Sequence, residues 1–123
     1  MRHQVMLCLG ANKDAEIHIQ KAQQLLQKHL PDFRFSETMW TDPVGIDSPP
    51  FLNCVGWGET EMEYDELRQF TKKMERNVGD RKYLRAKGII KLDIDILLYD
   101  GQKYHSEDWE REYIQVLTNK CHE

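Results

Sequence analysis

The stretch "KLDIDILLYD", Lys91–Asp100, is the part of the sequence that decides the fold. Apolar residues occupy every second position of it: Leu92, Ile94, Ile96 and Leu98. The positions between them are Asp93, Asp95 and Leu97. Since successive side chains of a strand point to opposite faces, both carboxylates are expected on the same face. The pattern predicts a strand of an antiparallel sheet that has one covered and one open face, with the carboxylates on the open face.

Length and composition limit the class of protein. The chain has 123 residues, of which 40% are hydrophobic and 31% charged, which is typical of a globular protein, and we expect residues 1–123 to form a single domain. The net charge of -4 does not favour a nucleic-acid partner, because such proteins usually carry a basic excess. No apolar run approaches the roughly 18 residues of a membrane span, so we expect no membrane partner.

Cysteine usage and the first residues bear on the compartment. The cysteines are Cys8, Cys54 and Cys121, an odd number without a C-x-x-C pair, which favours a reducing compartment. The start "MRHQVMLCLGANKD" lacks the apolar region and cleavage pattern of a signal peptide. We therefore expect a cytoplasmic protein.

Periodicity and breaker residues predict the order of elements. Strands are expected at Gln4–Gly10, Phe33–Trp40, Phe51–Thr60 and within Lys91–Asp100, and helices from about Asp14 to Lys28, at Tyr64–Val78 and within Ser106–Asn119. Two strand-helix-strand halves predict an α+β fold of the ferredoxin-like βαββαβ type. It would have a four-stranded antiparallel sheet with helices packed on one face.

The first helix carries two more specific expectations. Asn12 and Asp14 are residue types that cap helix starts, so we expect them to cap this one. The inward positions are expected to be apolar: Ile17, Ala22, Leu25 and Leu26.

The acidic pair on the last strand is a candidate metal site. Asp93 and Asp95 lie two residues apart, about 7 Å along a strand, and can converge on a shared cation. Mg²⁺ is commonly held by one or two carboxylates together with substrate phosphates, and two such ions can clamp a phosphoryl transfer. The alternative is that the two acids only solvate an exposed sheet face.

A basic segment precedes this strand. "DRKYLRAKGIIK", residues 80–91, contains Arg81, Lys82, Arg85, Lys87 and Lys91, and Glu75 lies just upstream. Acids for the ions and basic groups for phosphate oxygens are what a Mg-nucleotide site requires. A solvated charge run is the alternative. The pattern G-x-x-x-x-G-K-[ST] is absent, which excludes a P-loop kinase.

The long loop "TDPVGIDSPP", residues 41–50, leads into a third candidate feature. Phe51 and Asn53 share one face of the following strand, where a ring can stack on a flat heterocycle and an amide can hydrogen-bond its edge. The alternative is that Phe51 is a core residue.

Together these segments resemble a known family. "LCLGAN", "TDPVG", "PPFLN", "MERNVGDR" and above all "KLDIDILLYD" are similar to 6-hydroxymethyl-7,8-dihydropterin pyrophosphokinase, over about Leu7–Tyr99. The resemblance implies the ferredoxin-like fold. It also implies transfer of pyrophosphate from ATP to the hydroxymethyl group of the pterin in folate biosynthesis, with release of AMP.

The resemblance also implies roles for individual residues. Asp93 and Asp95 match the catalytic ligands of two Mg²⁺ ions that bridge the ATP phosphates, and Arg81 lies one position from a basic catalytic residue. The nucleotide contacts it implies are Glu75 and Arg81, with Lys87 and Lys91 from the basic segment. The pterin contacts it implies are Thr41, Val44, Phe51 and Asn53.

The chain departs from the family at two places. The family usually reads G-P-R-x-x-D-x-D, whereas this chain has Ile90 at the arginine position. Lys87 or Lys91 could substitute, but lysine lacks the bidentate fork of arginine. The family's later segment, with a Pro-His pair, an Arg and a Phe, has no match in "YHSEDWEREYIQVLTNKCHE".

Side chains of that final segment could still contribute to the site. Trp109 or Tyr113 could supply a second stacking ring, and His105 or Arg111 a polar contact. Three interpretations stay open: an active pyrophosphokinase, a degenerate homologue that binds a pterin or nucleotide, and an interaction domain. The oligomeric state, monomer or homodimer, is also open.

Overall fold

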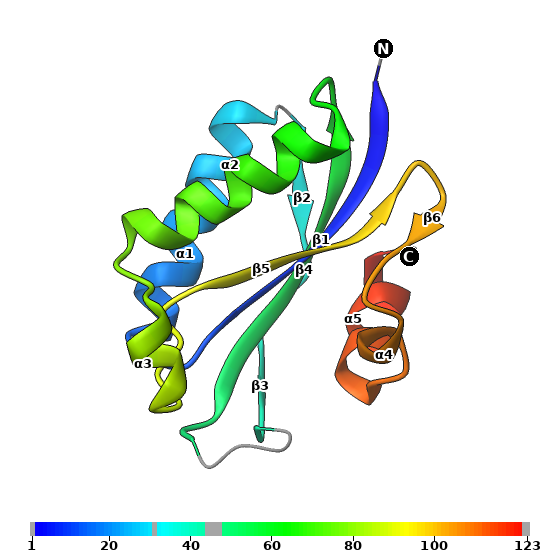
Figure 1. The fold of residues 1–123 in the computed structure, drawn as a ribbon. Coiled ribbons are helices and arrows are strands. Elements are labelled where there is room, and N and C mark those ends of the chain that lie inside the picture. The colour runs from blue at the N-terminus through cyan, green and yellow to red at the C-terminus, as the bar shows by residue number, and fades with distance from the viewer. Residues whose placement is uncertain (1, 31, 44–47, 122–123) are drawn as a thin grey trace.

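A computed structural model describes residues 2–30, 32–43 and 48–121 of the chain. Figure 1 shows an elongated sheet with two long helices, α1 and α2, on one side and the C-terminal helices α4 and α5 on the other. The mixed α/β fold with an antiparallel sheet is therefore confirmed. The open second face is not, because α5 packs on part of it.

Within the described residues the sheet has six strands, in the order β2-β4-β1-β5-β6, with β3 also paired to β4. The strands are β1 His3–Ala11, β2 Arg34–Phe35, β3 Met39–Thr41, β4 Phe51–Thr60, β5 Asp93–Tyr99 and β6 Gln102–Lys103. Every pairing is antiparallel. The expectation of four strands is wrong, because the second strand is interrupted and a short hairpin adds β6 after β5.

The interruption between β2 and β3 is centred on Ser36. Its N–H donates to the Val55 carbonyl at 2.8 Å, and its hydroxyl accepts from the Val55 N–H at 2.9 Å. The Ser36 side chain thus replaces a backbone acceptor, and the pairing with β4 shifts by one residue between β2 and β3. Such a shift is a bulge, which bends a strand and increases its twist.

The helices are α1 Ala15–His29, α2 Tyr64–Asn77, α3 Lys82–Ala86, α4 Ser106–Trp109 and α5 Glu112–Cys121. The sheet face under α1 and α2 holds the main core, whose strand residues include Leu7, Leu9, Leu52, Ile94 and Ile96. Among the described residues, no helix is long and apolar enough to span a membrane.

The inward face of α1 differs from the expected one. Ile17 is 55% exposed and Leu25 38% exposed, so both expectations are wrong. The buried residues of the helix are Ala15, Ile19, Ala22 and Leu26. Their spacing of four, three and four residues follows one stripe of an α-helix, which includes Ala22 and Leu26 but not the other two positions.

The expected capping of α1 is also wrong. Asp14 occupies the N-cap position in a left-handed conformation, with φ 47, and makes no side-chain cap hydrogen bond. The Asn12 side chain instead donates to the Gly88 carbonyl at 2.7 Å and accepts from the Ile90 N–H at 2.7 Å. Asn12 therefore ties the end of β1 to the segment that leads into β5.

Strand β5 alternates as expected only as far as Leu97. Its pairing with β1 skips Leu97, since Leu7 faces Ile96 while the preceding Met6 faces Leu98. Leu97 is buried in the cluster on the second face, and Leu98 packs against the same cluster. The expectation that Leu98 shares a face with Ile96 is wrong, because an extra residue in one strand resets the alternation.

The second face of the sheet carries the C-terminal segment. The single expected helix is two, α4 and α5, and Ile114 and Leu117 of α5 are fully buried against the sheet. Their cluster consists of Met6, Cys8, Val55, Leu97, Ile114 and Leu117. This smaller core stops short of Asp93 and Asp95, which leaves a hollow beside them.

Candidate active site

The two carboxylates lie next to each other on the second face. In the register with β1, Asp93 faces Gly10 and Asp95 faces Cys8. Their side chains are 32% and 23% exposed, so each is partly removed from water yet open to a ligand. Both line one pocket of about 220 Å³.

The pocket is formed by segments that are far apart in the sequence. Predicted site residues in its lining are Thr41, Phe51, Asn53, Asp93 and Asp95. The lining also includes Cys8, Gly10, Asp42, Pro43 and Ile90. The C-terminal segment adds Asp108, Arg111 and Tyr113. The candidate pterin and metal residues thus share one pocket; Val44 lies outside the described residues.

Asn53 is held firmly at the bottom of this pocket. It is buried, and its Nδ2 donates to Thr41 Oγ1 at 2.7 Å, which joins β4 to β3. A Cβ on Gly10 would lie 3.1 Å from Asn53 Oδ1, so a glycine on β1 gives the amide the space that it occupies. The amide is therefore pre-oriented, as recognition of a heterocycle edge requires.

Asp93 and Asp95 are close enough for the charge of one to affect the ionisation of the other. Burial raises the pKa of Asp95 to about 8, with the charge of Asp93, its hydrogen bond and the charge of Asp108 adding to the effect. A carboxyl that retains its proton near neutral pH lacks a sufficient positive partner. A divalent cation would supply that charge, and oxygen-only donors suit a hard cation such as Mg²⁺.

A second set of possible ligands adjoins Asp95. One ligand atom each of Asp95, His105 and Asp108 lies within 4.8 Å of the others. Asp108 is also 3.5 Å from Arg111 Nε, so part of its charge is met within the protein. The imidazole would make this set more suitable for Mn²⁺ or Zn²⁺ than for Mg²⁺.

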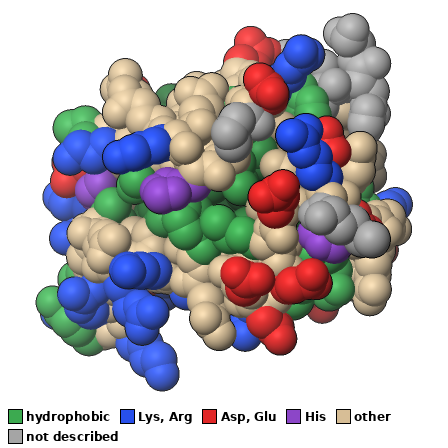
Figure 2. All heavy atoms as spheres, turned by 90° about the horizontal axis from the view of Figure 1, so that it is seen from above, with side chains coloured by type: hydrophobic (Ala, Val, Ile, Leu, Met, Phe, Trp, Pro, Cys, Tyr) green, Lys and Arg blue, Asp and Glu red, His purple; other side chains and the backbone are tan. Residues whose placement is uncertain are grey.

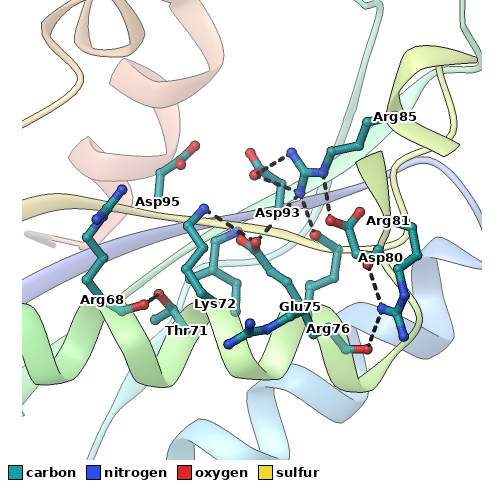
Figure 3. Close-up of polar contacts among 12 residues, drawn as sticks. Arg68, Thr71, Lys72, Glu75, Arg76, Asp80, Arg81, Arg85, Asp93 and Asp95 are labelled. Carbon is teal, nitrogen blue, oxygen red and sulfur yellow. Dashed lines mark hydrogen bonds and ion pairs between the residues drawn. The ribbon is translucent and has the colours of Figure 1, made fainter. Parts of the chain in front are cut away.

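Arg85 is a site residue that the sequence interpretation did not single out. It extends from α3 to Asp93 Oδ1, with Nη2 at 3.2 Å and Nη1 at 3.3 Å (Figure 3). Its Nε donates to Asp80 Oδ2 at 2.7 Å, and its Nη2 also donates to the Leu92 carbonyl at 3.1 Å. The basic segment therefore does reach the carboxylate pair, through a residue other than those predicted.

The other predicted basic residues point elsewhere. Arg81 Nη1 donates to the carbonyls of Arg76 and Asp80, and Figure 3 shows its guanidinium turned away from Asp93 and Asp95. Lys91 Nζ lies over Gly79, where a Cβ would be 3.0 Å from it. Lys87 is exposed at the end of α3. In this arrangement none of the three is brought to the pocket.

Glu75 has a structural position. It is 4% exposed, and its Oε2 accepts from the Ile94 N–H at 2.8 Å, while its Oε1 lies 3.3 Å from Lys72 Nζ. Burial raises its pKa, against the lowering effect of the Ile94 hydrogen bond. Glu75 therefore links α2 to β5 at Ile94, the residue between Asp93 and Asp95, and does not face open solvent.

The C-terminal segment contributes one of the two possible rings and both of the possible polar residues, since His105 Nε2 lies 3.7 Å from Asp95 Oδ1. Tyr113 and Arg111 line the pocket, whereas Trp109 donates its indole N–H to the Leu97 and Tyr104 carbonyls at 3.1 and 3.0 Å. Tyr113 thus stands in the pocket that contains Phe51. Only the packing of α4 and α5 on the sheet distinguishes the two aromatic residues.

A larger hollow lies at another part of the molecule. About 420 Å³ in volume, it is lined by residues that include Arg2, His29, Glu59, Glu61 and Met62. Figure 2 shows the face of the molecule seen from above Figure 1, with apolar side chains in its middle and basic and acidic groups around them. The predicted site residues line the smaller pocket instead, so chemistry and not volume identifies the candidate site.

Known proteins that are similar to this chain identify its family. Residues 6–122 match the family of 7,8-dihydro-6-hydroxymethylpterin-pyrophosphokinase. The chain belongs to this family. The match runs past Tyr99, the end of the resemblance in the sequence, and so includes the pocket residues of α4 and α5.

Curated relatives carry related names. The chain is 29% identical over 130 residues to "2-amino-4-hydroxy-6-hydroxymethyldihydropteridine pyrophosphokinase" of Porphyromonas gingivalis, covering 91% of this chain and 86% of that protein. It is 30% identical to a "Folate synthesis bifunctional protein" of Arabidopsis thaliana, over 90% of this chain, and 32% identical to one of Chlamydia muridarum, over 81%. The chain spans about a quarter of the length of these bifunctional relatives, 25% and 24%.

Proposed function

We propose that this protein transfers pyrophosphate from ATP to the hydroxymethyl group of 6-hydroxymethyl-7,8-dihydropterin, in a Mg²⁺-dependent reaction of folate biosynthesis. Membership of the pyrophosphokinase family supports the reaction class. The observation that carries the proposal is that Asp93 and Asp95 line the same pocket as Phe51 and Asn53. A phosphate-activating pair and a heterocycle-binding pair are thus within reach of one another.

The pterin would lie between Phe51 and Tyr113. Both rings line the pocket, and aromatic rings bind a flat heterocycle by stacking. Asn53, held by Thr41, would hydrogen-bond the polar edge of the heterocycle. This arrangement would direct the hydroxymethyl group toward the carboxylates.

Asp93 and Asp95 would hold the cation, and we propose two ions. Bound Mg²⁺ would neutralise phosphate charge and orient the polyphosphate. The proton that Asp95 retains, with its pKa raised to about 8, would have to leave as the cation binds. The pterin hydroxyl would attack the β-phosphorus, the bond from that phosphorus to the AMP oxygen would break, and the hydroxyl proton would pass to solvent.

The finer description of the fold belongs to the same proposal. We count β2 and β3 as one bulged strand and leave out β6 as an addition. The four remaining strands, numbered along the chain, then lie in the order second, third, first, fourth across the sheet, which supports the ferredoxin-like type. We further propose a single domain over residues 1–123, small-molecule partners, a cytoplasmic location, and a monomer or homodimer.

An AMP assay tests the reaction directly. Purified protein with ATP, Mg²⁺ and 6-hydroxymethyl-7,8-dihydropterin is expected to form AMP and the pterin pyrophosphate in equal amounts. Omitting the pterin or chelating Mg²⁺ should abolish both products. Absence of AMP at high protein concentration, with Mg²⁺ and both substrates present, would contradict the proposal.

Binding without transfer is the second candidate function. Ile90 lines the pocket at the position where the family usually has an arginine, so one phosphate contact is missing there. Calorimetric titration of the pterin, with and without Mg²⁺ and an ATP analogue that cannot be cleaved, separates the two functions. Heat of binding without AMP formation would favour a degenerate homologue, whereas no heat in any combination would leave an interaction domain.

A further inference from the structure

Arg85 is surrounded by carboxylates. Besides Asp80 and Asp93, Glu75 Oε1 lies 3.7 Å from its Nη2. The Arg85 side chain is 32% exposed, so a ligand can reach it from solvent. It is therefore a half-exposed cation placed on one of the two carboxylates that we propose for metal binding.

The contact with Asp93 competes with a metal ion. Both terminal nitrogens of Arg85 are directed at the same oxygen, Oδ1 of Asp93, at 3.2 and 3.3 Å. A divalent cation bound to Asp93 would come within a few ångströms of the guanidinium, where like charges repel. A cation bound at Asp93 Oδ1 would therefore displace Arg85 from that oxygen.

Asp80 determines where Arg85 can go. Its Oδ2 accepts from Nε at 2.7 Å, a nitrogen other than the two that contact Asp93, and Asp80 is itself buried. A rotation about this hydrogen bond would leave Nη1 and Nη2 free to point into the pocket. The guanidinium fork fits phosphate oxygens in the same bidentate way as carboxylate oxygens.

We propose that Arg85 neutralises Asp93 in the ligand-free protein. When a divalent cation binds Asp93, the two terminal nitrogens of Arg85 exchange Asp93 for the nucleotide phosphates as their hydrogen-bond acceptor. The inference rests on the proposed function. In this proposal an arginine from α3 binds the phosphates. Ile90 occupies the position before β5 at which the family usually has an arginine. It also assigns Asp80 as the positioning residue that keeps Arg85 beside the site.

Mn²⁺ binding provides a test that does not depend on activity. Loss of the free Mn²⁺ signal in electron paramagnetic resonance measures binding, first of Mn²⁺ alone and then with a non-cleavable ATP analogue. Arg85→Gln is expected to bind Mn²⁺ alone roughly threefold to tenfold more tightly, because a competing positive charge is removed. The same variant should bind the Mn-nucleotide about tenfold to a hundredfold more weakly, because charge-assisted hydrogen bonds are lost.

Two other variants make the comparison specific. Arg34→Gln removes the same charge from an exposed position on β2, at the other edge of the sheet, and should match the parent in both titrations. Arg85→Lys retains the charge but not the fork. It should bind Mn²⁺ alone like the parent and the Mn-nucleotide about tenfold more weakly.

Opposite shifts in the two titrations of Arg85→Gln support the proposal, and no other pattern does. Unchanged or weaker binding of Mn²⁺ alone overturns the neutralising role, and unchanged nucleotide affinity overturns the phosphate contact. If Arg85→Gln does not fold, Arg85→Lys decides, and parent-like nucleotide affinity overturns the proposal. If the parent binds Mn²⁺ neither alone nor with nucleotide, the proposed function is refuted as well. If the parent forms AMP and the Arg85 variants bind Mn²⁺ and the Mn-nucleotide as the parent does, only this inference is refuted.

Discussion

The two faces of the sheet differ in what their buried residues do. Under α1 and α2 the strands contribute a continuous apolar core that includes Leu7, Leu9 and Ile94. On the other face the cluster under α5 is smaller, and it borders a pocket lined with carboxylates. The first face buries apolar surface for stability, whereas the second tolerates polar groups that stability alone would not favour.

Two carboxylates, one on each side of β5, show this difference. Glu75 of α2 is buried, but it accepts the Ile94 N–H and lies 3.3 Å from Lys72 Nζ. Asp95 is half-buried beside Asp93, and its pKa is raised to about 8 by its partial burial and by the neighbouring acids. Glu75 is thus paired within the protein, whereas Asp95 lies among other acids, where the cation that we propose would compensate its charge.

The largest expected effect is the loss of transfer on changing Asp95 to Ala. Removing one cation ligand should lower the rate of AMP formation by about a thousandfold, because stabilisation of developing charge is lost. Chemical denaturation of the same variant should show no loss of stability in the absence of metal. The exposed acid Asp65, changed to Asn, is the control and should retain the parent rate. A parent-like rate in the Asp95 variant would show that the metal assignment is wrong.

The next effect is on the opposite face. Leu67 of α2 is fully buried, and Leu67→Ala should lower the free energy of unfolding by about 2–5 kcal/mol, through lost burial and a cavity. Leu25→Ala, at the outward position of α1, should cost about 1 kcal/mol or less. Mn²⁺ affinity of the folded Leu67 variant should equal that of the parent. If it fell in step with stability, the division between the two faces would not hold.

Asp95 contributes to the pH dependence of stability. The pKa of Asp95 is about 8 in the folded protein, compared with an ordinary value of 3.8. At a pH between these two values, the folded state keeps a proton that the unfolded state has lost. Stability present at pH 4 should therefore decline as the pH rises toward 8, with a slope of up to about 1.4 kcal/mol per pH unit from this group. Denaturation curves of the parent and Asp95→Asn, without metal, measure the difference. Equal slopes would exclude an elevated pKa at Asp95, and Mg²⁺ should stabilise the parent more at pH 8 than at pH 5.

The smallest effect is expected at the link between the end of β1 and the segment that leads into β5. Asn12→Ala removes the side-chain hydrogen bonds to Gly88 and Ile90 and should cost about 1–2 kcal/mol. Faster amide hydrogen exchange is expected in residues 82–90, with little change in the strands of the main core. Gln24→Ala, at an exposed position of α1, is the control. Uniformly faster exchange throughout the protein would show that Asn12 supports the whole fold instead.

Local patterns predicted part of this arrangement well and other parts poorly. The alternation around Asp93 and Asp95 places both on one face because it depends only on the strand backbone. The interrupted strand at Ser36 and the skipped Leu97 were not predicted, since a bulge depends on pairing with another strand. The inward face of α1 was predicted only in part, because Ile17 is as apolar as Ile19 and only the packing direction distinguishes them.

The sequence by itself determined the family, the mixed α/β class and the pair of carboxylates on β5. Each of these follows from short segments of sequence, because it depends only on the residues in the segment and on the local backbone geometry. The tertiary structure alone decided that Arg85 and not Arg81 reaches Asp93, and that Tyr113 and not Trp109 lines the pocket. These choices depend on the directions in which α3 and α5 pack against a sheet built from distant parts of the chain, and no local pattern contains them.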